Sequence, residues 1–256
     1  YIKIKIMKLT ELTDFLDSYL SIAEIDDVAL NGLQVEGNAD VNKIALATDT
    51  CTETINKAAS LRADMLLTHH GLFWGKPLAV RGTHKARIKT LLSNDISLYS
   101  AHLPLDAHRE VGNNAELIKI LDYTIVEPFG VYHGVWIGYK AVRKNALTYQ
   151  EILTKLKDSL EAEPTGYNFG PDEIKTLAVI SGDGASMIEQ LAGTDIDLFL
   201  TGEQDHISFH IAKELHVNLV FSGHYATETL GVKNLGALLS NKFGLETVFI
   251  DVPTGL

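Results

Sequence analysis

Short apolar runs alternate with stretches of helical spacing along most of the chain. The apolar runs of the first half are Ile44–Thr48, Met65–Thr68 and Ile96–Ala101, and helical spacing follows the first two over Cys51–Arg62 and Thr83–Ser93. Such alternation is typical of a parallel sheet that is covered by helices on both faces. We therefore predict an α/β fold with mainly parallel sheets flanked by helices.

The pattern is interrupted in the middle of the chain and then resumes. Residues Val131–Val142 have strand character without a clean period, Thr148–Leu160 have helical spacing, and Glu163–Asp172 are rich in Gly and Pro, which predicts a loop. Apolar runs then return at Leu177–Ile180, Leu198–Leu200, Leu219–Phe221 and Val248–Asp251. We therefore predict an α/β core over residues 7–124 and 176–256, in two intertwined lobes, with an inserted lobe over residues 125–175.

The composition limits which partners and which cellular compartment we expect. The formal net charge is −11, which disfavours broad attraction to nucleic acid or to an anionic membrane. Cys51 is the only cysteine, so no internal disulfide forms, and no apolar run approaches the ~20 residues of a membrane span. We expect a cytoplasmic protein. Residues 1–6 precede Met7 without a signal-peptide pattern, and we interpret them as an upstream extension or a cloning remnant.

Most residues that could bind a metal ion or take part in catalysis follow directly after a predicted strand. They are His69, His70, His102, Asp106, Glu203 and His224. In open α/β sheets, ligands bind in the crevice beyond the carboxyl ends of the strands. These side chains, although far apart in sequence, are therefore expected to converge there.

Each candidate taken alone has an ordinary structural explanation. The adjacent His69 and His70 are also compatible with one core and one surface histidine, and Asp106 with the cap of a turn. The spacing of four between His224 and Glu228 also suits a surface pair on a helix.

The combination favours metal. Histidines with carboxylates suit zinc, iron or manganese, and five ligands exceed the four of a closed structural zinc site. They suit two divalent transition-metal ions ~3.5–4 Å apart, with Glu228 as the candidate bridge. We therefore predict the metal ligands His69, His70, Asp106, His224 and Glu228. His102 and Glu203 are the candidate catalytic residues, which would move protons.

Several spaced motifs resemble one family. They are Leu67-Thr-His-His-Gly-Leu-Phe-Trp74, Ala101-His-Leu-Pro-Leu-Asp-Ala107 with Gly112-Asn-Asn114, Leu200-Thr-Gly-Glu203, Ser222-Gly-His-Tyr-Ala-Thr-Glu228, Asn31-Gly-Leu-Gln-Val-Glu36 and Phe249-Ile-Asp-Val-Pro253. In this order they resemble the YbgI-type dinuclear metal proteins, relatives of the NGG-interacting factor that are named GTP cyclohydrolase 1 type 2 homologues. The resemblance implies the same five ligands, a cavity lined by His102, and a homohexameric toroid. Position 225 is a tyrosine, where some relatives have a second histidine. His206 is a further histidine that could add a ligand.

Three functions stay open on the sequence. The first is a metal-dependent hydrolase that acts on a nucleotide-like substrate, for which the family name suggests GTP. Lys76, Arg81, Lys85 and Arg87 could then bind phosphate, or could form a solvated helix face. The second is a two-metal phosphoesterase or amidohydrolase, and the third is a metal storage or delivery protein without catalysis. Whether the protein is an enzyme at all is therefore undecided at this stage.

Overall fold

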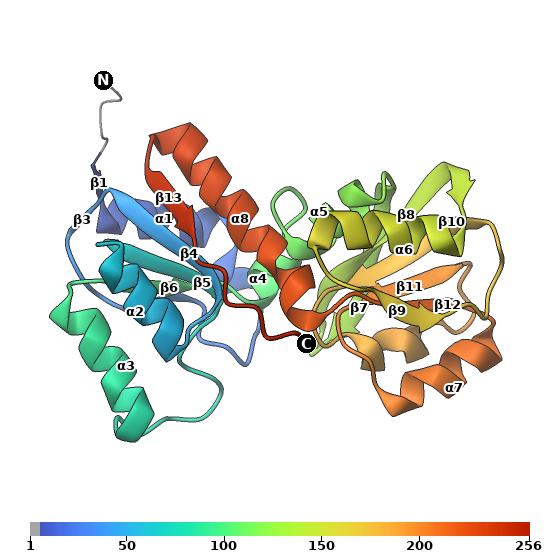
Figure 1. Cartoon of the computed structure of the whole chain (residues 1–256), viewed down its shortest axis with the longest axis horizontal. Helices are drawn as coiled ribbons and strands as arrows, with labels where there is room; N and C mark the ends of the chain where they lie inside the picture. The colour runs from blue at the N-terminus through green and yellow to red at the C-terminus, as the bar shows by residue number, and fades with distance from the viewer. Residues whose placement is uncertain (1–5) are drawn as a thin grey trace. The chain divides into compact units, whose positions relative to one another are not determined.

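The computed structural model describes residues 6–256, which form two compact units (Figure 1). The first unit comprises the chain as far as Leu105 together with Gly231–Val252, and the second comprises Asp106–Leu230 and Pro253–Leu256. Neither unit is continuous in sequence. The chain passes from the first unit to the second at residue 106, returns to the first at residue 231, and ends in the second. The expected extension over residues 1–6 lies, apart from residue 6, outside the described part.

The first unit contains the predicted parallel sheet. Its strand order is β13 (Glu246–Phe249), β4 (Lys43–Asp49), β5 (Met65–His70), β6 (Ser97–Ser100) and β2 (Gly32–Val35). All neighbours are parallel except β2, which runs antiparallel to β6. Five of the six residues of β5 are buried, as expected for a central strand that is covered on both faces. The three strands predicted in the first half of the chain are thereby confirmed.

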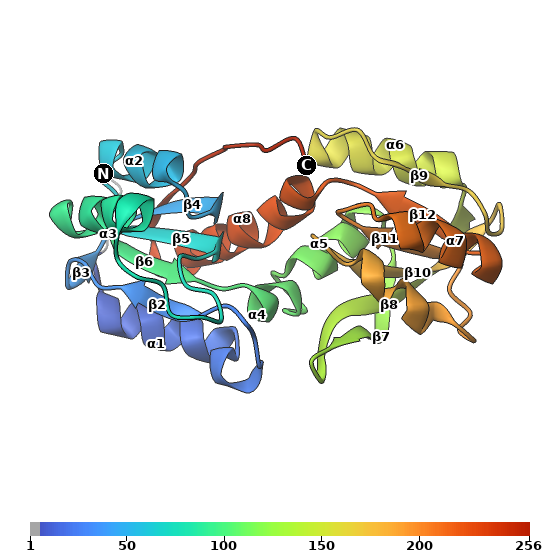
Figure 2. The same ribbon diagram turned by 90° about the horizontal axis from the view of Figure 1, so that it is seen from below.

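Helices cover both faces of this sheet. Ala45 and Ala47 of β4 belong to one core cluster with Ile55 and Ala58 of α2 (Thr52–Ser60), whereas Leu46 between them meets Gly236 of α8 (His224–Phe243). Because successive strand residues point to opposite faces, α2 and α8 lie on opposite sides. Figure 2 shows α2 and α3 (Gly82–Ser93) on one side of the strands and α1 (Leu9–Tyr19) on the other. Smaller elements complete the unit: β1 (Met7–Lys8), η1 (Ile22–Glu24) and β3 (Asp40–Val41).

The second unit has a mixed sheet. Its strand order is β7 (Thr124–Tyr132), β8 (Val135–Leu147), β10 (Ile174–Ile180), β11 (Leu198–Thr201), β12 (Asn218–Phe221) and β9 (Thr165–Tyr167). Only the β10–β11 and β11–β12 pairs are parallel, so the expectation of mainly parallel pairing is wrong for this sheet. For the β7–β8 pair the reason is local: His133 and Gly134, both at positive φ, close the two strands into a tight hairpin, and hairpins are antiparallel.

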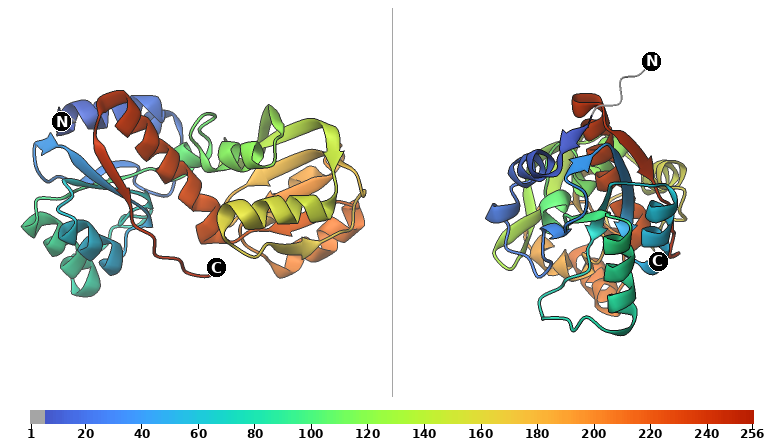
Figure 3. Two further views of the ribbon diagram at one scale, coloured as in Figure 1. Left: turned by 45° about the horizontal axis from the view of Figure 1, so that its top comes forward. Right: turned by 90° about the vertical axis from the view of Figure 1, so that its left-hand side faces the viewer.

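Apolar packing again places helices on both faces. Ile152 and Leu156 of α6 (Tyr149–Leu160) share a buried cluster with Leu177 and Val179 of β10, to which α5 (Asn113–Ile120) also contributes. On the other face lie η2 (Ala185–Leu191) and α7 (His206–Leu215), which contact each other. The left-hand view of Figure 3 shows α6 in front of the strands. The fold is therefore mixed α/β with helices flanking both sheets.

The middle segment is built into the second sheet. Residues 125–175 supply most of β7 together with β8, α6 and β9, and β9 lies inside the stretch 163–172 that the sequence predicts to be a loop. A three-residue edge strand within a Gly- and Pro-rich stretch has no alternating pattern to reveal it. The interpretation of 125–175 as an inserted lobe stays a prediction. No helix in residues 6–256 combines the length and the apolarity that crossing a bilayer requires.

Candidate metal centre

Three histidine rings of the first unit lie together where strands end. His69 and His70 are the last two residues of β5, and His102 follows β6. The ring centroids of His69 and His70 are 4.6 Å apart, and those of His102 lie 5.1 Å from His69 and 5.5 Å from His70. One ligand atom from each ring lies within 4.8 Å of the others, a spacing that a single metal ion can bridge. The structure thus brings together three side chains that the sequence places beyond strand ends.

In both His69 and His70, the Nδ1 atom makes a hydrogen bond to an oxygen. His69 Nδ1 lies 2.9 Å from the carbonyl oxygen of Ala101, and His70 Nδ1 lies 2.8 Å from a carboxylate oxygen of Asp49. A carbonyl and an ionised carboxylate can only accept, so in both rings Nδ1 carries the hydrogen and donates it. A neutral ring then presents the lone pair of Nε2, which is the form that binds metal. Asp49 therefore orients His70 and does not cap α2, whose N-cap is Cys51.

The third ring is held in the same way. His102 Nδ1 lies 3.0 and 3.1 Å from the two carboxylate oxygens of Asp27, whose side chain is only 1% exposed. Burial by itself raises the pKa of Asp27, but the hydrogen bond and charge of His102, with further donors, outweigh it and hold the pKa at about 2. Asp27 is therefore ionised at neutral pH and accepts the Nδ1 hydrogen of His102.

An indole forms one wall of the histidine cluster. The ring of Trp74 lies 5.0 Å from that of His102 and 5.7 Å from that of His70, and its Nε1 donates to the carbonyl of Gly71 at 3.0 Å. A β-carbon on Gly71 would lie 2.2 Å from Nε2 of Gln34. The Gln34 amide therefore packs directly against the Gly71 backbone, and a larger residue there would have to displace it.

A second group of ligand-type side chains lies in the second unit. His224 begins α8 and Glu228 follows one turn later, so both project from one face. His224 Nε2 is 2.9 Å from Glu228 Oε2, and His224 Nδ1 is 2.5 Å from Glu203 Oε1. Burial lowers the pKa of His224, but the hydrogen bond and charge of Glu228, and then those of Glu203, outweigh it and raise the pKa to about 9.

Asp106 lies near Glu228 in the same unit. Its Oδ1 accepts from Asn113 Nδ2 and from Ser181 Oγ, both at 2.8 Å, and the residue is 6% exposed. One carboxylate oxygen of Asp106 lies within 4.8 Å of one of Glu228. Two carboxylates this close and this buried repel each other unless a cation or a proton lies between them. Asp106 is therefore part of a carboxylate pair and is not a simple turn cap.

The loop Ser181–Gly184 lies directly against this pair. Gly182 has φ +61°, and a β-carbon there would lie 2.0 Å from Glu228 Oε1. The N–H of Gly182 donates to Thr227 Oγ1 and that of Gly184 to Thr201 Oγ1. These N–H groups are bonded to side chains, and the missing side chain of Gly182 leaves room for the Glu228 carboxylate.

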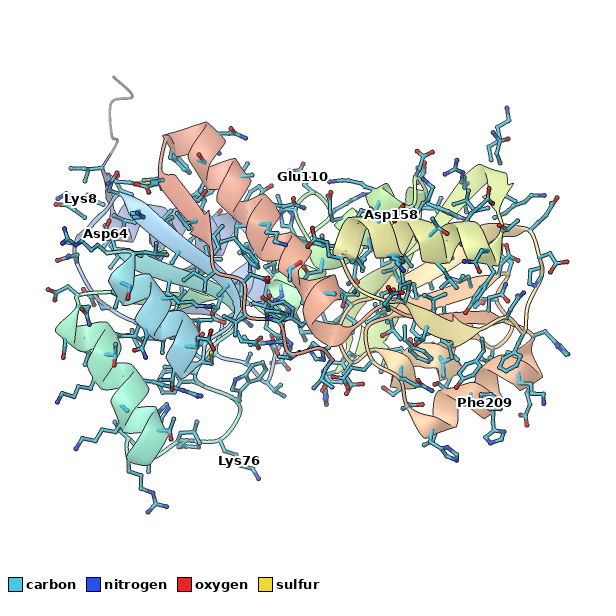
Figure 4. All side chains as sticks on the ribbon, in the orientation of Figure 1. Lys8, Asp64, Lys76, Glu110, Asp158 and Phe209 are labelled. Carbon is cyan, nitrogen blue, oxygen red and sulfur yellow. The ribbon has the colours of Figure 1, made fainter. Side chains whose placement is uncertain are left out.

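The basic residues considered for phosphate binding, and His206, lie outside the two groups of ligand-type side chains. Lys76 extends from the loop before α3 (Figure 4), Arg81 and Lys85 are also exposed, and Arg87 contacts Thr52. His206 is exposed on α7 with its ring 5.9 Å from that of His210, and among residues 6–256 it belongs to none of the groups of three or more side chains that could hold a metal ion.

The donor set fits divalent transition metals. Imidazole nitrogen with carboxylate oxygen suits zinc, iron and manganese, whereas calcium and magnesium prefer oxygen alone. All four histidines of the two groups have Nδ1 bound to an oxygen. An oxygen partner on the far nitrogen is the usual support of a metal-binding imidazole. Fold and donors together define a candidate metal-binding α/β protein.

Comparison with known proteins identifies the family. The chain belongs to the Duf34/NIF3 (NGG1p interacting factor 3) family, whose model matches residues 7–255. A protein of Pyrococcus abyssi named GTP cyclohydrolase 1 type 2 homolog is 47% identical over 251 residues, covering 98% of this chain and 100% of the relative. The homologue of the same name in Deinococcus radiodurans is 41% identical and covers 96% of this chain and 94% of its own. The resemblance that the sequence motifs indicate is thereby confirmed.

Solved structures agree with this assignment. The protein ybgI, described as of unknown function, superposes with a TM-score of 0.91 at 35% identity, covering 98% of this chain and all of its own. Reduced HcgD from Methanocaldococcus jannaschii superposes with a TM-score of 0.85 at 30% identity, with the same coverage. The likeness extends over nearly the whole chain, so it includes both groups of ligand-type residues.

Proposed function

We propose that the protein holds two divalent transition-metal ions, zinc, iron or manganese, with His69, His70, Asp106, His224 and Glu228 as ligands. The observation that carries the proposal is that the histidine ligands all have an oxygen acceptor beside Nδ1. His69, His70 and His224 each have Nδ1 within 2.9 Å of an oxygen acceptor, which is the usual support of a metal-binding imidazole.

Two ions suit this donor set better than one. Five protein ligands exceed the four of a tetrahedral structural site, and a carboxylate has two oxygens that it can share. We assign the bridge to Glu228, which is 3% exposed and lies close to both Asp106 and His224. We assign the five ligands to one set because the family that the sequence motifs resemble implies the same five.

The reaction that suits this centre best is hydrolysis of a nucleotide-like substrate. Bound divalent ions supply Lewis-acid activation of water and of the electrophilic atom. We assign His102, whose Nδ1 lies 3.0 Å from Asp27, the role of exchanging a proton with substrate or solvent. Glu203 holds His224 while its own side chain is 42% exposed, so it can pass a proton to bulk water.

A hollow beside Glu203 limits how a nucleotide could lie. It has a volume of about 320 Å³, and its lining includes Glu163, Glu203, Gln204 and Phe221. Two carboxylates with an aromatic ring suit a base or another group that donates hydrogen bonds, and they repel phosphate. A triphosphate would therefore extend away from this hollow.

Two other functions use the same ligands. The first is metal storage or delivery without catalysis, and the second is a phosphoesterase or amidohydrolase reaction. The proposal also includes a cytoplasmic homohexameric toroid, as the family resemblance implies. The mass of the particle in solution, measured by light scattering, tests the oligomer: six chains are expected, and a monomer would refute it.

Turnover separates these functions. Metal-loaded protein is incubated with GTP and formate is measured, alongside a His69→Ala variant and a matched His133→Ala variant in the β7–β8 turn. Formate release that is lost only in His69→Ala supports the cyclohydrolase reaction. Release of phosphate instead supports the phosphoesterase, and transfer of metal to an apo-acceptor without turnover supports delivery. Failure of the protein to retain any metal would refute all three.

A further inference from the structure

Asp27, in the loop before β2, is surrounded by hydrogen-bond donors. Its Oδ1 accepts from the N–H of Ala29 at 3.0 Å, and its Oδ2 accepts from Asn31 Nδ2 at 2.9 Å and from the N–H of Leu103 at 3.1 Å. The Nδ1 of His102 lies within 3.1 Å of both oxygens. A buried carboxylate is costly unless such donors compensate it, so the arrangement is specific to a charged residue.

Asn31 completes the contact with the same histidine. Its Nδ2 donates to Asp27, while its Oδ1 accepts from the backbone N–H of His102 at 2.7 Å. Asp27 and Asn31 therefore hold the backbone on both sides of the His102 α-carbon, and Asp27 also holds the ring. Ring and backbone are fixed by residues that lie more than 70 positions earlier in the chain.

This contact determines which nitrogen of His102 carries the hydrogen. With an ionised acceptor at Nδ1, the neutral ring adopts the Nδ1–H tautomer and Nε2 keeps its lone pair. The same ring lies 5.1 Å from His69 and 5.5 Å from His70, measured between centroids. A ring that flipped or changed tautomer would no longer offer its nitrogen lone pair to the same cluster.

We propose that Asp27 is the positioning residue of the histidine cluster: it fixes His102 as the Nδ1–H tautomer and directs Nε2 toward His69 and His70. Asn31 assists by fixing the His102 backbone. The functional meaning of this role rests on the proposed metal centre, but the tautomer itself does not. A residue that merely anchored the loop would affect stability and leave the ring nitrogen unchanged.

The test measures the ring nitrogens directly. Metal-free protein with ¹⁵N-labelled histidine is studied by two-dimensional NMR above pH 7.5, and His102 is assigned by its loss in His102→Gln. We expect Nδ1 of His102 to carry the hydrogen in the wild type and both tautomers to be populated in Asp27→Asn. The matched control is Asp26→Asn, which removes the same charge one residue earlier from an exposed side chain and should leave the tautomer unchanged.

Metal affinity gives an independent readout. Zinc titration against a chelator should show a loss of affinity in Asp27→Asn, because the released His102 ring lies 5.1 and 5.5 Å from the rings of the ligands His69 and His70, and no loss in Asp26→Asn. A wild-type His102 protonated at Nε2 would overturn the proposal, and so would an unchanged tautomer in folded Asp27→Asn. If that variant fails to fold, the wild-type tautomer still decides. If no variant binds metal, the proposed function fails while the NMR result still reports on Asp27.

Discussion

Asp49 and His70 face each other across two parallel strands. They are register partners at the ends of β4 and β5, and Asp49 Oδ1 accepts from His70 Nδ1 at 2.8 Å. The sheet itself therefore sets the orientation of this ring, because the two residues have no freedom to separate without breaking the strand pairing. The same arrangement, an oxygen acceptor beside Nδ1, is found at every histidine of the candidate centre.

Removing the carboxylate of Asp49 should weaken metal binding. Asp49→Asn leaves the strand intact but removes the charge that orients His70, so zinc affinity should fall by roughly 10–100-fold. Competition titration with a chelator measures this change. Asp40→Asn is the matched control, since it also removes a carboxylate from an ion pair, with Lys8, but on the exposed surface of the same unit. Equal affinity in the two variants would argue against an orienting role for Asp49.

Gly182 should be required for more than backbone conformation. Gly182→Ala places a β-carbon 2.0 Å from Glu228 Oε1, so the carboxylate must move. Gly193→Ala is matched in backbone, with φ +77°, but its β-carbon would meet no atom within 4 Å. Both variants should lose about 1–2 kcal/mol in chemical denaturation from left-handed strain. Only Gly182→Ala should also lose bound metal, and full metal content in that variant would contradict the close approach to Glu228.

His224 should titrate well above the ordinary range in the metal-free protein. Its ordinary pKa is 6.5, and the neighbouring carboxylates of Glu228 and Glu203 raise it to about 9. The stabilisation from this charged network is complete below pH 6.5 and is lost as the pH rises through 9. Histidine NMR should show the transition near pH 9, and Glu203→Gln should lower it. Titration near pH 6.5 in the wild type would contradict the network.

Metal uptake should consequently release a proton from His224 near neutral pH. Calorimetric titration with zinc in two buffers of different ionisation enthalpy measures protons released per ion bound. We expect fewer protons from Glu203→Gln than from the wild type. An identical proton count in the two proteins would show that His224 is already neutral before metal binds.

Glu228 should serve more than one ion. Glu228→Ala should lower the metal content by more than one ion per chain, because a bridging carboxylate contacts both ions. Glu163→Ala, which removes an exposed glutamate paired with Lys157 in the same unit, should retain the wild-type content. Elemental analysis of both purified variants measures the difference. Retention of two ions in Glu228→Ala would exclude the bridging role.

The sequence predicts the strands that bury both faces. Continuous apolar runs such as those of β4, β5 and β11 are easy to detect because central strands tolerate few polar residues. Locating these strands also locates the candidate site residues that follow them. By contrast β9 has three residues, and the hairpin of β7 and β8 has an irregular period because of a register shift. Their antiparallel pairing depends on turn geometry that apolarity does not report.

The supporting residues of the site are harder to predict. Asp49 is visible as a strand-end carboxylate, but Asp27 lies 75 positions before His102 in an irregular loop, so no local pattern connects them. Gly182 and Ser181 form an ordinary Gly-rich turn in the sequence, and only the approach of Glu228 and Asp106 gives them a role. An Asp four residues before an Asn is the single hint, because that spacing lets their side chains bond.

The central claim is that the protein binds two transition-metal ions per chain. Elemental analysis of protein purified without added metal, normalised to chain concentration by amino-acid analysis, tests it most directly. We predict close to two ions of zinc, iron or manganese per chain, and a sharp reduction in the His69→Ala/His70→Ala double variant. Wild-type protein that contains no stoichiometric transition metal, and that takes up none from a metal-supplemented buffer, would contradict the account.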